Sequence, residues 1–188
     1  STCNVFYWGE VRVGTYMWGS SIVNLAHDND MIGVESSTMN GTNASTNWSA
    51  LYTTIDQANA VLKYAPTINM SDKERGFAIG QASFARAYCY FWAARLWGDV
   101  PLNLVPIESV SQPECYPVRA PKAEVYAQIG KDIETAIENA EYLGGNCYFA
   151  TKTAVNLLKA EYALWMYTNQ KGGDSYLTLA QDALDALD

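Results

Sequence analysis

Histidine and cysteine, the residues that most often build metal centres and nucleophile–base pairs, are scarce in this chain of 188 residues. It has one His, His27, and four Cys, none of them arranged as a C-x-x-C pair. A structural zinc site needs about four closely spaced ligands of these types. His27 has no Ser or Cys beside it in a recognisable nucleophile motif. The sequence therefore predicts no metal site, no hydrolase triad and no bound cofactor.

Positive charge is also sparse. Twelve Lys and Arg residues stand against twenty Asp and Glu residues, which gives a net charge of −8. Without a Lys/Arg cluster, this sign of charge disfavours nucleic acid and anionic lipid as partners. The most apolar stretch, 76–98, contains Arg86 and Arg95, and a lipid-facing charge is costly. We expect no nucleic-acid partner and no membrane-spanning helix.

Acidic residues are plentiful, but their spacing matches neither a catalytic pair nor a calcium loop. Asp132 and Glu134 do not share a helix face, and Glu134 and Glu138 share a solvated one, which disfavours an acid/base pair of the glycosidase type. The acidic segment 28–30 begins like an EF-hand loop, but Met39 occupies the twelfth position, where calcium needs a bidentate Glu. We therefore assign no catalytic residues and no metal ligands.

The chain is rich in helical periodicity, with apolar residues recurring at three- and four-residue steps after residue 47. Ser71 followed by Glu74 is the signature of a capping box, and Asn47 can cap the helix before it. Helices are predicted with the approximate bounds 47–66, 71–98, 121–144, 151–168 and 176–187, with Pro121 at a first helical position. A weaker pattern predicts a further helix over 6–18.

Several residues with polar or reactive side chains lie on faces that these helices must bury. Asn59 falls on the apolar stripe of its helix, so its amide needs hydrogen-bond partners. Arg86 and Arg95 lie in a charge-poor helix, and each needs an acidic or carbonyl partner where it is buried. Cys89 lies inside the same helix, where a small buried hydrophobe is more common than a reactive thiol.

The order of these elements predicts an all-α single domain over residues 1–188, built from tetratricopeptide-like antiparallel helix pairs. The loop 169–174 is short enough to force an antiparallel hairpin, and small residues such as Ala160 and Ala183 let its helices approach. The helices on either side of 66–71 form another such pair.

Two long segments lack this periodicity. Residues 19–47 form a polar, turn-rich excursion, and a loop of this length is usually functional or disordered. Residues 99–119 contain enough Pro to prevent a long helix and predict an extended connector. No initiator Met or leader precedes Ser1, and the helical pattern continues to Asp188 without a stop signal. We therefore expect a fragment of a longer protein whose targeting segment has been removed.

Motifs around the second predicted helix resemble those of one protein family. In chain order they are Ala58-Asn59, FARAY at 84–88, LWGDVPL at 96–102, Arg119, and EVY at 124–126 with Ile129, Asp132 and Ala136 in the expected rhythm. Together they resemble the SusD/RagB family of nutrient-binding outer-membrane lipoproteins of Bacteroidetes. The match covers about 48–188. Ala120 and Ile133 depart from the family pattern, and neither touches binding.

This resemblance implies a SusD-like helical scaffold that lacks the family's C-terminal loop-rich region. It also implies a role in polysaccharide utilisation, in which a non-catalytic protein captures an oligosaccharide or other glycan for a SusC-like TonB-dependent outer-membrane transporter. The expected location is the cell surface, through a lipid anchor absent from this chain, since Cys3 has no preceding lipobox. Two alternatives stay open: a scaffold that docks the transporter without its own sugar site, and an α-helical glycoside-processing enzyme.

Sugar binding needs an apolar platform for the C–H face of a ring, and amides or carboxylates for its hydroxyls. The resemblance implies that ligand contacts come from loops after the first helix. The candidate ligand-binding residues there are Trp18, Asp28, Asn29, Asp30, Asn43, Asn47 and Trp48. The structural alternative is that Trp48 packs at the start of its helix and that the Asn side chains stabilise turns.

Overall fold

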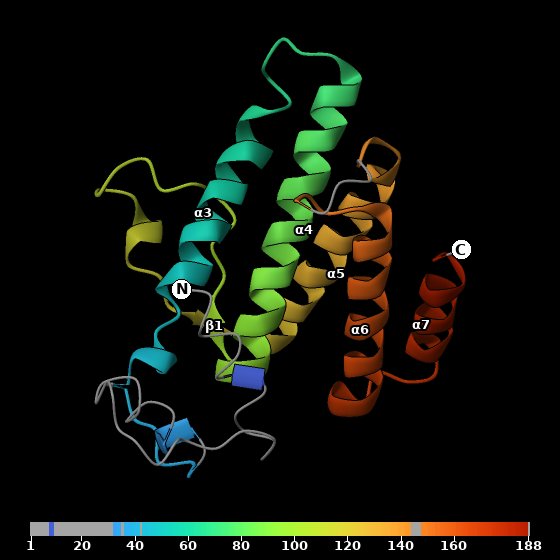
Figure 1. The fold of residues 1–188 in the computed structure, drawn as a ribbon. Helices are drawn as coiled ribbons and strands as arrows, with labels where there is room; N and C mark the ends of the chain where they lie inside the picture. Colours follow the sequence, from blue (N-terminus) through green and yellow to red (C-terminus); the bar gives the residue numbers. More distant parts are fainter. Residues whose placement is uncertain (1–7, 10–31, 35, 42, 144–147, 188) are drawn as a thin grey trace, which may run out of the picture. The chain divides into compact units, whose positions relative to one another are not determined.

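The computed structural model describes residues 8–9, 32–34, 36–41, 43–143 and 148–187 (Figure 1). The chain divides into two compact units, Ser1–Ala50 and Leu51–Asp188. The expectation of a single domain over residues 1–188 stays a prediction. Apart from Trp8 and Gly9, the helix predicted over 6–18 lies outside the described residues.

The described part of the first unit is made of short turns. Residues 32–34 form a single helical turn, and Ala44–Thr46 form a 3-10 turn. The indole N–H of Trp8 donates to the carbonyl of Ser45 over 2.6 Å. The described part of the polar excursion thus consists of short turns, and one long-range hydrogen bond joins it to Trp8.

From Ser49 onward the chain is all-α, as the sequence predicted. The helices are α3 (Ser49–Tyr64), α4 (Asp72–Trp97), α5 (Lys122–Glu138), α6 (Lys152–Gln170) and α7 (Ser175–Asp185). A small antiparallel ladder joins β1 (Val100–Pro101) to β2 (Arg119–Ala120). Figure 1 shows successive helices running in opposite directions, with α3 beside α4 and α6 beside α7. The two predicted helix pairs are therefore present.

The ends of the helices follow local chemistry. The predicted capping box is confirmed, because the Glu74 N–H donates to Ser71 Oγ over 3.3 Å while the Ser71 N–H donates to Glu74 Oε2 over 2.9 Å. Pro121 is extended, with ψ 135°, so it precedes the first helical residue of α5 instead of occupying that position. That helix also ends at Glu138, earlier than predicted, and a 3-10 turn over Ala140–Tyr142 follows it.

α4 packs closely against the short segment after α5 because it presents glycines to that segment. A Cβ on Gly76 would collide with the ring of Tyr142, and a Cβ on Gly80 would lie 3.0 Å from Leu143 Cδ2. The absence of a side chain at these two positions lets Tyr142 and Leu143 approach the backbone of α4, which brings more apolar surface out of water.

Arg95 near the end of α4 has the acidic partner that the sequence required. Its guanidinium bonds to Glu161 of α6 and lies over the rings of Phe91 and Trp92, at 4.6 and 4.7 Å from their centroids. The ring of Trp165 lies 5.4 Å away on α6. Arg95 therefore joins α4 to α6 by an ion pair and by cation–π contacts.

Cys89 is a buried hydrophobe, as predicted, with 6% of its surface exposed. Burial raises the pKa of its thiol to about 11, while a hydrogen bond with Thr54 opposes the shift. At pH 8 the reactive thiolate is then a fraction of roughly one in a thousand.

We expect peptide-resolved mass spectrometry of iodoacetamide-treated native protein to show Cys89 alkylated at least about tenfold more slowly than the half-buried Cys115. Equal labelling of the two would contradict the packing of α3 on α4.

Candidate functional site

A buried polar cluster joins α3, α4 and α5. Arg86 of α4 donates from Nε and Nη2 to the two carboxylate oxygens of Asp132 of α5, over 2.8 and 2.6 Å. It also donates from Nη1 to Asn59 Oδ1 of α3 over 2.8 Å. Gln128 adds a 2.8 Å hydrogen bond to Asp132. The predicted need of Arg86 and Asn59 for partners is therefore confirmed, and both are met within one cluster.

The cluster extends to the connector through the amide group of Asn59. Its Nδ2 donates to the carbonyls of Asn103 and Val105 over 3.0 and 3.2 Å. Beside it, the Tyr90 hydroxyl donates to the Asn103 carbonyl and accepts from the Asn103 N–H, each over 2.7 Å. Burial raises the pKa of Tyr90, so its hydroxyl keeps the proton it donates. The start of the connector is thus hydrogen-bonded to buried side chains of α3 and α4.

The Gly-Asp-Val-Pro motif closes the two ends of the connector on each other. Gly98 ends α4 with φ +71°, a backbone conformation that favours glycine. Asp99 Oδ1 then accepts from the Lys122 N–H over 2.8 Å, which caps α5. Arg119 donates to the carbonyl of Asp99 over 2.7 Å and to that of Trp97 over 3.4 Å. The motif therefore ends α4 and holds the start of the connector against the start of α5.

Between its closed ends the connector is a packed surface loop, similar in construction to an Ω-loop. It runs along α3, where Ile107 N–H donates to Asp56 Oδ1 over 2.8 Å and Glu108 pairs with Lys63 over 2.6 Å. Within the connector, Gln112 donates to the Pro106 carbonyl over 3.2 Å and so stabilises the bend between them. The prediction of an extended connector is right, and the structure adds that side-chain hydrogen bonds hold it in place.

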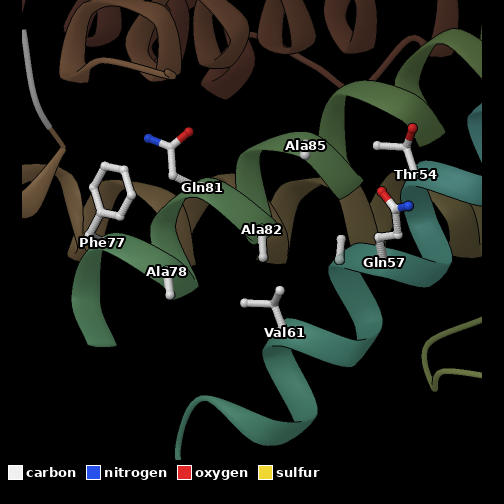
Figure 2. A pocket seen from close by; sticks show the side chains of 9 residues that line it. Thr54, Gln57, Val61, Phe77, Ala78, Gln81, Ala82 and Ala85 are labelled. Atoms are coloured by element: carbon white, nitrogen blue, oxygen red, sulfur yellow. The ribbon is translucent and has the colours of Figure 1, made fainter. Parts of the chain in front are cut away.

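Two hollows lie on the second unit. The first, which we call the connector pocket, measures about 540 Å³. Its lining includes Asn103, Pro113, Glu114, Tyr116, Arg119 and Glu124. The second, the α3–α4 groove, measures about 360 Å³ and is mostly apolar. Figure 2 shows side chains of α3 and α4 lining it, among them Thr54, Val61, Phe77, Ala78, Gln81 and Ala85.

The sequence-predicted site lies partly within the described residues. Trp18, Asp28, Asn29 and Asp30 fall outside them. Asn43, Asn47 and Trp48 lie in the short stretch around the 3-10 turn that precedes α3.

The hydrogen bonds of the two described Asn side chains are turn contacts. Asn43 Oδ1 accepts from the Asn40 N–H over 2.9 Å, and Asn47 Oδ1 accepts from the Ser49 N–H over 2.8 Å at the start of α3. Trp48, between them and the helix, is half-buried. These contacts agree with the structural alternative for the Asn oxygens, and sugar binding at this stretch stays a prediction.

Two features that would bear on metal chemistry and on membrane insertion are absent from the part of the chain that the structure describes. Among residues 8–9, 32–34, 36–41, 43–143 and 148–187, no group of three or more His, Cys, Asp and Glu side chains is arranged to hold a metal ion. No helix in this described part combines the length and the apolar character needed to cross a bilayer. The described residues do offer the connector pocket, the α3–α4 groove and the turn-rich stretch before α3.

The sequence matches, over residues 9–163, the SusD-like family described as "Starch-binding associating with outer membrane". This chain belongs to the SusD-like family. SusD-like protein P38 of Formosa agariphila is 29% identical over 167 residues, which cover 88% of this chain and 31% of that protein. Proteins of this family bind carbohydrate and are not catalysts, in agreement with the expectation of a non-enzyme.

Solved structures of SusD-like proteins share the fold. NanU of B. fragilis superposes with a TM-score of 0.82 at 27% identity, and the match covers 99% of this SusD-like chain and 37% of NanU. A laminarin binding SusD-like protein superposes with a TM-score of 0.72 at 22% identity, over 90% of this chain and 34% of that one. This chain thus spans about a third of the length of these relatives.

The sequence did not reveal Asp132 as the partner of Arg86, nor the connector pocket. Asp132 is separated from Arg86 by 46 positions, so no helical spacing links them. The sequence carries one signal that bears on the pocket, because Tyr116 stands before Pro117 in a segment rich in Pro. A residue before Pro is restricted to extended backbone, which does not determine whether its ring is exposed.

The buried ion pair generates a stability prediction. Replacing Asp132 by Ala leaves the buried Arg86 guanidinium without its carboxylate partner. We therefore expect the free energy of unfolding in urea to fall by about 3–5 kcal/mol. The matched control on the same helix is Glu134→Ala, which removes the 3.0 Å pair with Lys159 from a half-exposed carboxylate and should cost about 0–1 kcal/mol. A double variant Arg86→Met/Asp132→Leu should be more stable than Asp132→Ala alone. Equal effects of Asp132→Ala and Glu134→Ala would contradict this account of the cluster.

Proposed function

We propose that this chain is part of a non-catalytic, cell-surface subunit that binds a glycan for a SusCD-type nutrient import system of the outer membrane. The observation that carries the proposal is the family match over residues 9–163, whose description joins starch binding to the outer membrane. Supporting it, one of the structural relatives is a laminarin binding protein. The partner in this proposal is a SusC-like TonB-dependent transporter, and attachment to the membrane is through a lipid anchor.

The proposed ligand contacts are those of the predicted site, at Trp18, Asp28, Asn29, Asp30, Asn43, Asn47 and Trp48. The chemistry of this set supports the proposal, because an indole ring offers a platform for a sugar ring and the amides and carboxylates suit its hydroxyls. The turn contact of Asn47 is compatible with this role, since it engages the side-chain oxygen and an Asn side chain also carries an amide nitrogen with two N–H donors.

Isothermal titration of the 188-residue chain with a panel of neutral oligosaccharides tests the proposal. We expect heat of binding with at least one member, and we expect Trp48→Ala to weaken it about tenfold, which corresponds to roughly 1.4 kcal/mol. The control is Tyr148→Ala, which removes an aromatic ring that is 86% exposed and lies outside the predicted site. Absence of binding across the whole panel would refute the proposed function.

The α3–α4 groove favours a second candidate function, a scaffold that docks the transporter without a sugar site of its own. The groove is mostly apolar. Gln81 in its lining is held in place by two hydrogen bonds between its side-chain amide and the backbone of Ala150, over 2.8 and 2.9 Å. Phe77 in its lining packs edge-to-face against Phe149, with ring centroids 5.3 Å apart. Isolation of a stable complex with the transporter, together with no heat in the oligosaccharide titrations, would favour this function over the first.

A further inference from the structure

We propose that the connector pocket is an oligosaccharide-binding site whose platform is the ring of Tyr116. The proposal rests on the glycan-binding function proposed above and adds a site outside residues 18–48. The ligand class is a neutral oligosaccharide, bound by ring stacking and by hydrogen bonds to its hydroxyl groups.

Tyr116 is exposed because its backbone is held by a 3-10 turn and a proline. Pro113–Cys115 form the turn, and the Tyr116 N–H donates to the Pro113 carbonyl over 3.0 Å. Pro117 follows directly and fixes its own φ. The Tyr116 side chain is 81% exposed. A large ring that the fold leaves in water offers an apolar face for the C–H side of a sugar ring.

Polar residues share the pocket with this platform. Its lining includes Asn103, Glu114, Arg119 and Glu124 beside apolar residues. Carboxylates and amides accept and donate the hydrogen bonds that sugar hydroxyls require. The volume, about 540 Å³, falls in the range of roughly 300–1,000 Å³ that is typical of small-ligand sites. An apolar platform edged by polar groups is the combination that saccharides need.

The charges of the pocket favour a neutral ligand. The lining includes two acidic residues, Glu114 and Glu124, and one basic residue, Arg119, whose Nη1 atom donates to the carbonyls of Trp97 and Asp99. An anionic sugar would meet net repulsion, whereas hydroxyl donors would meet acceptors. The apolar part of the lining includes Val118, which is 84% exposed and offers further surface to the C–H faces of a sugar chain.

The pocket is largely formed before any ligand binds. Two of its lining residues are held by the fold: Asn103 is hydrogen-bonded to Asn59 and Tyr90, and Arg119 belongs to the β1–β2 ladder. A site on fixed elements loses less conformational entropy on binding than a flexible loop does. The connector is therefore suited to present Tyr116 in a constant orientation.

The test is titration of ¹⁵N-labelled chain with maltoheptaose and, separately, with laminarihexaose, followed by amide chemical shifts. We expect shifts at Tyr116 and Arg119 with at least one of the two sugars, and an affinity at these amides that falls at least about tenfold in Tyr116→Ala. Tyr116→Phe should stay within about threefold of the unmodified chain, because it keeps the ring. Val110→Ala is the control, since Val110 is on the same connector and 84% exposed but does not line the pocket.

The outcomes separate the two proposals. Sugar-induced shifts confined to the stretch before α3, unchanged by Tyr116→Ala, would overturn the connector site and leave the proposed function standing. Absence of shifts anywhere with either sugar would overturn the connector site, while the wider oligosaccharide titrations decide the function. A transporter complex that Val118→Asp disrupts, together with no sugar-induced shift at Tyr116, would show that the pocket is a protein interface and would also overturn the proposal.

Discussion

The guanidinium of Arg86 is the charge around which the described helical unit is organised. It is 8% exposed, and a buried cation is tolerated only when it is paired and its donors are satisfied. Its fork bonds to both carboxylate oxygens of Asp132 and to the amide oxygen of Asn59. Because these three side chains come from α4, α5 and α3, satisfying one charge fixes three helices in register.

The same constraint explains why motifs far apart in the sequence occur together. Asn59 contributes its oxygen to Arg86 and its nitrogen to the connector carbonyls of Asn103 and Val105, so it links the cluster to the loop. The Ala-Asn pair, the Arg of α4 and the Asp of α5 therefore form one physical unit. The motifs that resemble the SusD-like family consist largely of residues that build this scaffold. They do not include the ligand-binding residues predicted from the sequence.

The helices could be predicted from local pattern, because their signals are local. The Ser71–Glu74 capping box and the glycine at position 98 act within one helical turn, and the structure shows both. Long-range pairings could not be predicted, since spacing along a helix gives no information about a partner on another helix. From the sequence, Asp132 is a rejected acid/base candidate and a residue of the family motif, and the structure shows that it neutralises Arg86.

The candidate sites were less accessible to sequence reasoning than the fold. The alternative explanation for the Asn side chains, turn chemistry, was correct for the oxygens of Asn43 and Asn47. The connector pocket depends on how a loop folds back on its own ends, which the positive φ of Gly98 and the contacts of Arg119 determine. Neither the closure of that loop nor the exposure of Tyr116 follows from composition alone.

Amide hydrogen exchange in an Asn59→Leu variant measures whether the buried cluster holds the connector in place. The variant removes the two hydrogen bonds to the connector and one acceptor of Arg86. We expect the amides of Asn103 and Ile107 to exchange about tenfold faster or more, while amides of α6 and α7 keep their rates. Unchanged exchange at Asn103 and Ile107 would contradict it.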